Sequence, residues 1–408
     1  MKNHPVLRDG HQVKLLQGSA EFFPELIRAI DAARSHIQIE TYIFNFHGEG
    51  AYVAAALERA GIRGLRVWVV VDGVGTPHLS DDWRIRFDKA GVEWRIYSPL
   101  GTLGLLIPSR WRRLHRKLCV IDGQVAFCGG INILDDLYDP QYGPLQAPRF
   151  DFAVCATGAL VQQVQEACTR LWWRLQAVRH VRQQNFPEAF SSFKAAGLHF
   201  PWLQSAHTSE KKWVARAGLL LRDNVLYRTQ IEKAYLKAIG TARHEIVIAN
   251  AYFLPGQKLR QALVLAAQRG VKVQLLLQGR YEYFMQYHAV RPVYRQMLGA
   301  GIEIYEYTQS FLHAKVAVID AHHEKPWATV GSSNLDPFSL LLAREANVVV
   351  ADGLFAKRLH EALTQAIEGD SLRIMPQTLK QRSQLLRALD WVAFGLMRFA
   401  IWLTGNRY

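Results

Sequence analysis

The stretches HRKLCVID (residues 115–122) and HAKVAVID (residues 313–320) share the pattern H-x-K-x-x-x-x-D and lie about half a chain apart. Each stretch is followed by a second shared element, GGIN at 129–132 and GSSN at 331–334. A pattern this specific seldom arises twice by chance, so the two copies indicate a repeated structural unit.

The segments around the two stretches repeat in the order strand, helix, strand, helix, strand, motif strand. Continuous apolar runs at 67–71 and 273–277 predict strands buried on both faces of a sheet. Helical spacing at 52–60 and 258–269 is followed in each copy by a glycine, which favours a helix end. This alternation predicts an α/β fold of two pseudo-symmetric α/β/α sandwich domains, with mixed, mostly parallel sheets and the active site at their interface.

Weak patterning between residues 178 and 212 predicts the boundary between the two domains near residue 205. We therefore expect a first domain over 1–205 and a second over 206–370. Beyond them we expect a separate apolar and basic C-terminal tail over 371–408.

The chain has 408 residues, half of them apolar, and a formal charge of +14. Such a basic surface suits a polyanion, namely nucleic acid, anionic lipid or a phosphate substrate. The four cysteines form no C-x-x-C pair, which favours reduced thiols in a cytosolic protein. The N-terminus MKNHPVLRDG has no apolar core of a signal peptide, and no apolar run is long enough for a membrane span.

The strand period places the histidine and lysine of each motif on one face, while Asp122 and Asp320 fall on the other. An imidazole beside an ammonium group, with amide donors nearby, forms a pocket for a tetrahedral anion. Two such pockets face to face allow one histidine to attack a phosphorus atom while the other protonates the leaving oxygen. The predicted residues of this site are His115, Lys117, His313, Lys315, Asn132, Asn334 and Ser332.

The duplicated motif resembles the phospholipase D superfamily, and the resemblance extends from about residue 12 to 370. Within that superfamily the chain is most similar to the bacterial cardiolipin synthases, and among these to the short B type without N-terminal membrane spans. The closer match is carried by IETYIF (39–44), RLHRKLCVIDGQVAFCGGIN (113–132), IANAYFLPG (248–256) and LHAKVAVID…WATVGSSNLDPFSL (312–340).

The resemblance implies two phospholipase D-like domains and a covalent phosphohistidine that carries the phosphatidyl group to a second alcohol. We favour His115 as nucleophile and His313 as acid and base, although the symmetric sequence leaves their order open. In this family the motif aspartates belong to the catalytic signature, whereas strand geometry here predicts an orienting or structural role for them. The family's histidine-orienting carboxylates match Asp151 and Glu345.

Neither the motifs nor the resemblance implies a metal or another cofactor. The stretch AHHE, ending in His322–Glu324, has ligand-type residues but lies in a predicted loop without further spaced partners. We therefore expect a solvated loop there. The chain also has no glycine-rich motif for a nucleoside triphosphate.

Two apolar segments favour a lipid substrate over DNA. The stretch LGLLIPSRWRR (103–113) precedes the first motif, and the tail QLLRALDWVAFGLMRFAIWLTGNRY forms an apolar, basic C-terminus. The alternatives are a loop packed on the core and a tail helix docked on the protein itself. The predicted membrane contacts are Leu105, Leu106, Ile107, Trp111, Trp391, Phe394, Phe399 and Trp402.

The sequence and the resemblance together predict a cardiolipin synthase bound peripherally to the cytoplasmic face of a bacterial inner membrane. It would join two phosphatidylglycerols into cardiolipin and glycerol at an anionic membrane, with no nucleic acid as partner. The alternatives are a hydrolase of phospholipids or nucleic acids and a non-catalytic lipid-binding protein. The donor lipid, the acceptor alcohol and the oligomeric state stay open.

Overall fold

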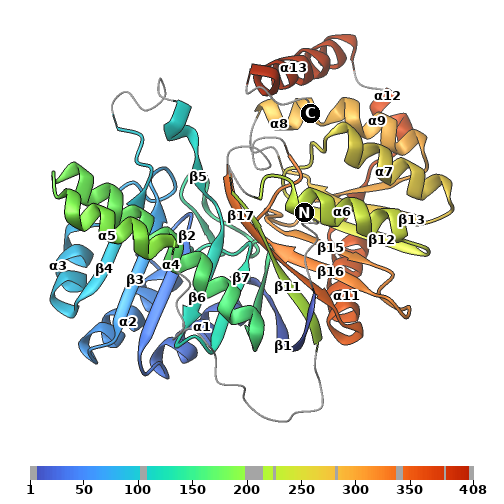
Figure 1. Ribbon diagram of the computed structural model, residues 1–408. Coiled ribbons are helices and arrows are strands. Elements are labelled where there is room, and N and C mark those ends of the chain that lie inside the picture. The colour runs from blue at the N-terminus through green and yellow to red at the C-terminus, as the bar shows by residue number, and fades with distance from the viewer. Residues whose placement is uncertain are drawn as a thin grey trace.

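The computed structural model describes residues 7–101, 108–197, 215–223, 227–280, 284–336, 343–380 and 383–403. Figure 1 shows two similar halves side by side, the first in blue to green and the second in yellow to red. The predicted boundary near residue 205 and the loop residues Leu105, Leu106 and Ile107 lie outside the described residues.

The first half follows the predicted alternation of strands and helices. Its elements are β1 (Arg8–Gln17), α1 (Gly18–Asp31), β2 (His36–Thr41), α2 (Glu49–Ile62), β3 (Arg66–Asp72), α3 (Asp81–Ala90), β4 (Val92–Tyr97), η2 (Pro108–Trp111), β5 (Arg113–Leu114), β6 (Lys117–Ile121), β7 (Val125–Gly129), β8 (Tyr138–Asp139), β9 (Gly143–Pro144), β10 (Phe152–Thr157), α4 (Ala159–Arg182) and α5 (Phe186–Gly197).

The second half repeats this order and adds a C-terminal helix. Its elements are β11 (Ala215–Arg222), α6 (Gln230–Thr241), β12 (Glu245–Asn250), α7 (Gln257–Gln268), β13 (Lys272–Gln278), α8 (Phe284–Ala289), α9 (Arg291–Gly299), β14 (Glu303–Tyr307), β15 (Lys315–Ile319), β16 (Trp327–Gly331), β17 (Ala343–Ala351), α11 (Gly353–Gly369), β18 (Ser371–Arg373), α12 (Pro376–Lys380) and α13 (Gln384–Leu403).

The main strands of both halves form one continuous sheet. Its order is β18-β14-β13-β12-β15-β16-β17-β11-β1-β10-β7-β6-β2-β3-β4. The β11–β1 pair lies at the centre, and the strands of the two halves occur in the same order from this pair outward on either side. Because β18 pairs with β14, the sheet continues three residues into the predicted tail.

The sheet is mixed, as predicted, but the expectation of mostly parallel pairing is wrong. Parallel pairs join β2 to β3 and β3 to β4, and likewise β12 to β13 and β13 to β14. The strands nearer the centre pair antiparallel, including each motif strand with its successor, β6 with β7 and β15 with β16. The first hairpin closes within a few residues at Asp122 and Gly123, and so short a connection permits only antiparallel strands.

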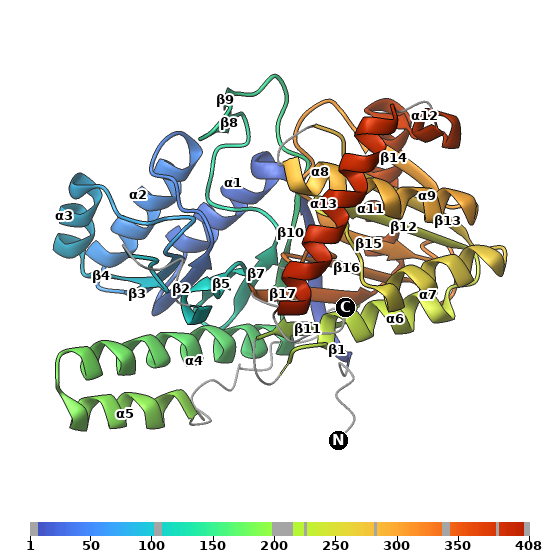
Figure 2. The same cartoon turned by 90° about the horizontal axis from the view of Figure 1, so that it is seen from above.

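Each half is an α/β/α sandwich, which confirms that part of the prediction. In the first half, helices α1, α2 and α3 cover one face of the sheet and α4 covers the other (Figure 2). In the second half, helices α6, α7 and α9 cover the corresponding face, opposite α11. The strands of both halves share one apolar core with α4 and α11, which fixes the two halves against each other.

Part of the weakly patterned segment is helical. Residues 178–182 complete α4, and α5 folds back against it. The residues that α5 buries are small, Ala189, Ser192 and Ala196, whereas Phe186 and Phe190 are exposed. Its apolar pattern therefore differs from that of a helix with a large apolar face toward the core, which made it hard to recognise.

Candidate active site

A cavity of about 500 Å³ lies between the two halves and is lined by both motif histidines. It is also lined by the two asparagines and the two carboxylates of the predicted site. The structure thus brings together His115, His313, Asn132, Asn334, Asp151 and Glu345.

The first motif histidine is held by a carboxylate of the second half. His115 Nδ1 lies 3.0 Å from Glu345 Oε1 and 3.2 Å from Glu345 Oε2. The carboxylate accepts the proton of Nδ1, which leaves Nε2 as the nitrogen with a lone pair. Backbone pairing sets this register, because β5 pairs with β17 and the His115 amide donates to the Arg344 carbonyl at 3.0 Å.

The second motif histidine is held in the reciprocal way by the first half. His313 Nδ1 lies 2.6 Å from Asp151 Oδ2. The His313 amide donates to the Phe150 carbonyl at 2.9 Å, again one residue before the carboxylate. Sequence alone had not shown which histidine each carboxylate serves, and the structure shows a crossed arrangement.

The motif lysines lie behind the histidines and not in the lining of the cavity. Lys117 Nζ donates to the His115 carbonyl at 2.7 Å, and Lys315 Nζ donates to the His313 carbonyl. Both side chains are buried. Burial, together with repulsion from Lys315, lowers the pKa of Lys117 to about 7.

The two carboxylates differ in their electrostatics. Burial alone would raise the pKa of Glu345, but the charges and hydrogen bonds of its neighbours, led by His115, bring it below its ordinary value. Burial raises the pKa of Asp151 to about 7 despite the opposing charge of Lys315.

Burial is the largest influence on both imidazoles. It lowers the pKa of His115, against the opposing charge of Glu345. It lowers the pKa of His313 still further, because the lysine charges add to its effect. Both rings are therefore mostly neutral near pH 7, the state that a nucleophile or a general base requires.

Ser332 is not among the residues that line the cavity, and its predicted contact with phosphate stays a prediction. Its hydroxyl donates to Glu345 Oε2 and accepts from the Ala346 amide at 3.1 Å. A serine hydroxyl so engaged supports the carboxylate that holds His115. The equivalent Gly130 has no room for a side chain, since a Cβ there would lie 2.2 Å from Asp151 Oδ1.

The two asparagines do reach the cavity. Asn132 Oδ1 accepts from the Ile43 amide at 3.2 Å, so its amide nitrogen is the group oriented to donate. Asn334 is buried in the equivalent position on the other side of the cavity. Their predicted contact with phosphate oxygens is compatible with these positions and stays a prediction.

The motif aspartates lie at the far ends of their strands and do not line the cavity. Asp122 accepts from the backbone amides of 34, 35 and 36, and Asp320 from those of 243, 244 and 245, all within 3.0 Å. Both residues adopt a positive φ at the end of the strand. The structural role expected from strand geometry fits these contacts, and direct catalysis does not, because the carboxylates are committed to backbone amides.

Several cavity residues were not among the predicted site residues. The Tyr42 ring lies 5.1 Å from that of His115, and Arg113, which also lines the cavity, donates to Asp72 Oδ1 at 3.0 Å. Tyr42 and Tyr252 follow equivalent strands in the two halves, in TYIF and AYF. This shared position after β2 and β12 was a recognisable signal in the repeat.

The predicted membrane contacts within the described residues fall into two places. Trp111 lines the cavity and is partly exposed, while α13 carries Trp391, Phe394 and Phe399. Trp391 and Phe399 are exposed, whereas Phe394 packs partly on the core of the second half. Trp402 belongs to α13, but its side chain lies outside the description. Within the described ranges, no helix is both long and apolar enough to span a membrane.

Comparison with known proteins identifies the family. The family model described as "Cardiolipin synthase, PLD-like domain" matches residues 26–141 and 235–367, one region in each half. Cardiolipin synthase B of Escherichia coli K12 is 34% identical over 407 residues, covering 98% of this chain and 90% of that protein. Cardiolipin synthase B of Salmonella typhi is 35% identical with the same coverage.

Solved structures support the same fold. The phosphatidylserine synthase of Haemophilus influenzae Rd KW20 superposes with a TM-score of 0.68 over 98% of this chain and 97% of its own, at 14% identity. At that identity the likeness concerns the fold alone. Together with the duplicated motif and the crossed site, the matches over nearly the whole chain show that it belongs to the phospholipase D superfamily, within the cardiolipin synthase family.

Proposed function

We propose that the protein is a cardiolipin synthase that transfers a phosphatidyl group from phosphatidylglycerol to the hydroxyl of a second phosphatidylglycerol, releasing glycerol. Full-length similarity to cardiolipin synthase B supports the activity. The observation that carries the mechanism is one cavity with two histidines, each bound at Nδ1 by a carboxylate. We also propose that the two phospholipase D-like domains span residues 1–205 and 206–370.

In the first step, His115 Nε2 attacks the phosphorus of the donor lipid. The bond from phosphorus to the glycerol oxygen breaks, and His313 gives a proton to that oxygen. His313 is neutral in most of the resting protein, so this step starts from the fraction in which the His313–Asp151 pair holds one extra proton. A phosphohistidine on His115 and free glycerol result. His313 is then neutral and able to accept a proton.

In the second step, the acceptor hydroxyl gives its proton to His313 Nε2 as its oxygen attacks the phosphorus. The bond between phosphorus and His115 breaks, which frees the imidazole and yields cardiolipin. The protonated His313 is ready for the next donor, so protons and bonds balance over the cycle.

The assignment of His115 as nucleophile rests on the difference between the two carboxylates. An imidazole bonded to phosphorus gains positive charge, and Glu345, which is ionised and bonded by Ser332, is suited to balance it. The pKa of Asp151, raised to about 7 by burial, suits a pair that gains and loses a proton in each cycle.

The buried cations would stabilise the phosphoryl group. A phosphate between the histidines would lie near Lys117 and Lys315, whose ammonium groups are held just behind them by the histidine carbonyls. Donation from Asn132 and Asn334 would add neutral hydrogen bonds to its oxygens.

The cavity wall favours transfer to a lipid alcohol over hydrolysis. Much of the wall is apolar, and it includes Leu134, Phe311 and Leu312. Such a wall binds acyl and glycerol carbons and displaces the water that would otherwise attack the phosphohistidine.

Helix α13 supports peripheral binding to an anionic membrane. One face packs on α8, where His288 and Asp390 lie 2.6 Å apart, and buries Ala393 and Met397. The opposite face exposes Leu385, Trp391, Val392, Leu396 and Phe399. With the formal charge of +14, this apolar face favours the headgroup region of anionic lipids, on the cytoplasmic side of a bacterial inner membrane.

The test is to incubate the purified protein with phosphatidylglycerol vesicles and to measure cardiolipin and phosphatidic acid by mass spectrometry. Cardiolipin made by the wild type, and lost in both His115→Ala and His313→Ala, would support the proposal. The exposed His78, outside the cavity lining, provides the control His78→Ala, which should retain activity. Phosphatidic acid alone would indicate a hydrolase, and no lipid turnover would direct the search to DNA substrates.

A further inference from the structure

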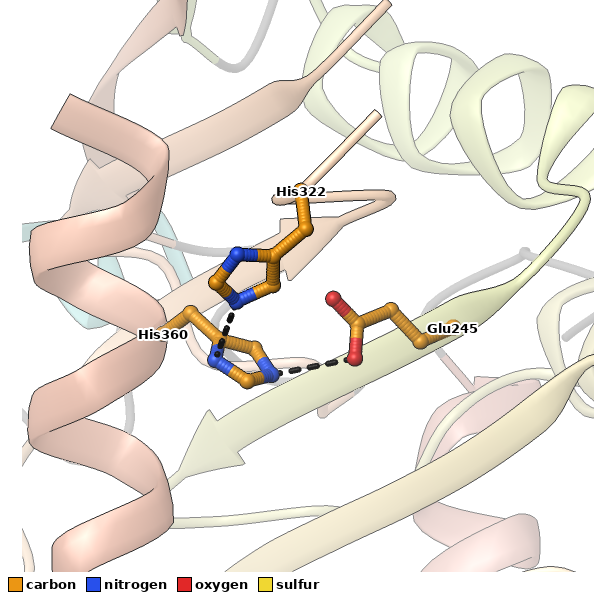
Figure 3. A group of neighbouring side chains, drawn as sticks. All are labelled: Glu245, His322 and His360. Carbon is orange, nitrogen blue, oxygen red and sulfur yellow. Dashed lines mark hydrogen bonds and ion pairs between the residues drawn. The ribbon is translucent and has the colours of Figure 1, made fainter. Parts of the chain in front are cut away.

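Three side chains outside the active-site cavity converge in the second half, where β12 begins and β15 ends. Figure 3 shows Glu245 from β12, His322 from the turn between β15 and β16, and His360 from α11. One potential ligand atom from each side chain can be chosen so that all three lie within 4.8 Å of one another.

The stretch containing His322 was expected to be a solvated loop without metal-ligand partners. The structure corrects the second part of that expectation, since Glu245 lies far earlier in the chain and His360 far later. Sequence spacing could not show this, because the partners meet only when α11 packs across the ends of β12 and β15.

The distance between the two imidazoles fits a shared metal ion. His322 Nε2 lies 3.3 Å from His360 Nδ1. Nitrogen ligands about 2.0–2.1 Å from a tetrahedral zinc ion lie about 3.3 Å apart, so an ion between these nitrogens needs little rearrangement. Without an ion, the two nitrogens form a hydrogen bond through one proton, and a divalent cation would replace that proton.

Glu245 completes the arrangement in two ways. Its Oε2 lies 3.0 Å from His360 Nε2, so the carboxylate orients the ring and directs Nδ1 toward His322. Its Oε1 is shielded from solvent and makes no hydrogen bond of good geometry within the described part of the chain, so it can turn toward a cation.

We propose that Glu245, His322 and His360 form a binding site for a divalent transition metal of the zinc type, with water in the remaining position. Two imidazoles and one carboxylate are a donor set that favours such ions over Ca²⁺ or Mg²⁺. The ion would fasten α11 and the β15–β16 turn to the start of β12.

The metal site would act on stability and not on the chemistry. The Glu245 amide donates to Asp320 Oδ1 at 3.0 Å, so the site adjoins the end of β15. His313 lies just before the other end of that strand. A bound ion would therefore hold the second half together without touching the substrate, and its removal should leave the rate of phosphatidyl transfer unchanged under conditions where the protein stays folded.

The experiment is a Co²⁺ titration of the full-length, tag-free protein, followed by visible absorption, with Zn²⁺ as competitor. We expect one Co²⁺ to bind per chain and to show the strong d–d bands of four-coordinate cobalt. These bands should disappear when Zn²⁺ displaces Co²⁺. His360→Ala should abolish the bands, and Glu245→Gln should weaken binding about 10- to 100-fold. Zn²⁺ should raise the melting temperature of the wild type and not that of His360→Ala.

The matched control is His323→Ala in the same turn. The His323 ring stacks on His244 at a centroid distance of 3.5 Å and is not part of the cluster, so this variant should bind Co²⁺ like the wild type. An equal loss of Co²⁺ binding in His323→Ala and His360→Ala would overturn the proposal. So would the weak bands of octahedral cobalt, or Co²⁺ binding that is unchanged in His360→Ala. Melting curves recorded without metal distinguish loss of the site from loss of the fold.

Discussion

His115 Nδ1 lies 3.0 Å from Oε1 of Glu345, a residue 230 positions further along the chain and in the other half of the molecule. The reciprocal pair, His313 with Asp151, makes the arrangement symmetric. Neither motif histidine is therefore paired with a carboxylate of its own half, and in the proposed mechanism the interface between the halves is part of the active site. A duplicated domain with this crossing can work only when both copies are present and in register.

Each crossed carboxylate should be essential to the rate. Glu345→Gln and Asp151→Asn keep the size of the side chain but remove the charge that fixes the histidine tautomer, and we expect cardiolipin formation to fall about 10²–10⁴-fold. Initial rates on phosphatidylglycerol vesicles measure this effect. A fall of less than threefold in a folded variant would show that the contact is not used in catalysis.

The covalent intermediate should show which of the two motif histidines is the nucleophile. If His115 is the nucleophile, radiolabelled phosphatidylglycerol should leave covalent label on His115 in His313→Ala, provided that the leaving glycerol departs without its acid. No label should appear on His313 in His115→Ala. Peptide mapping of the label tests the assignment, and label on His313 alone would reverse the roles.

Much of this site could be predicted from sequence, because strand geometry links residues that are close in the chain. His115 lies just before β6, Lys117 begins that strand, and Asn132 follows β7 of the same hairpin, so their spacing largely fixes their proximity. The same spacing predicted that Asp122 lies away from the histidine; it follows β6 and accepts from the backbone amide of Arg34, and its role in the reaction stays a prediction.

Other features depend on contacts between the halves, and spacing carries no information about them. The pairing of β5 with β17 decides that Glu345 meets His115. Ser332 faces Glu345 because β16 and β17 are neighbours in register, which turns it away from the cavity. The antiparallel core of the sheet was missed for a similar reason, since the alternation of strands and helices suggested mostly parallel pairing.

The motif aspartates should matter for stability more than for chemistry. Asp122→Asn or Asp320→Asn weakens three bonds to backbone amides, and we expect each to cost about 1–3 kcal/mol of unfolding free energy. Burial would raise their pKa values, but the amide bonds lower them below the ordinary value. The stability that the ionised aspartates contribute is therefore fully present above the unfolded-state pKa of about 3.9, and it is lost as pH falls through the folded-state pKa.

Denaturant unfolding at pH 7 and at pH 3 measures this effect. The difference in unfolding free energy between wild type and variant should be largest at pH 7 and smaller at pH 3. Transfer rates at a temperature where both proteins are folded should stay within about tenfold of the wild type. A loss comparable to that of Glu345→Gln in a stable variant would assign the aspartate to the chemistry.

Anion binding should be linked to protonation of Lys117. At pH 8 a lysine with a pKa lowered to about 7 by burial is mostly neutral. A bound dianion would raise that pKa, so binding should take up a proton from solution. Calorimetric titration with inorganic sulfate at pH 8, in two buffers of different ionisation enthalpy, measures the uptake. Lys117→Met should lose most of it, and equal uptake in the variant would exclude Lys117 as the source.

The exposed face of α13 should bind anionic vesicles. Trp391→Asp and Leu396→Asp should each weaken sedimentation with phosphatidylglycerol vesicles by roughly tenfold, because each removes the burial of a large apolar side chain. The control is Ile62→Asp at the end of α2, which Figure 1 places at the opposite end of the molecule from α13. Unchanged vesicle binding in both α13 variants would locate the membrane contact elsewhere.

Ser332 should set the lower pH limit of the reaction through Glu345. Its hydroxyl donates to the ionised carboxylate and helps keep the pKa of Glu345 low. Ser332→Ala removes that bond, so the pKa of Glu345 should rise and the acidic limb of the pH–rate profile should move to higher pH. Rates of cardiolipin formation between pH 5 and 9 test this, with unfolding curves to account for the Ala346 amide that loses its acceptor. A uniform loss of rate at every pH, with the limb unmoved, would mean that Ser332 supports the strand pair and does not tune the carboxylate.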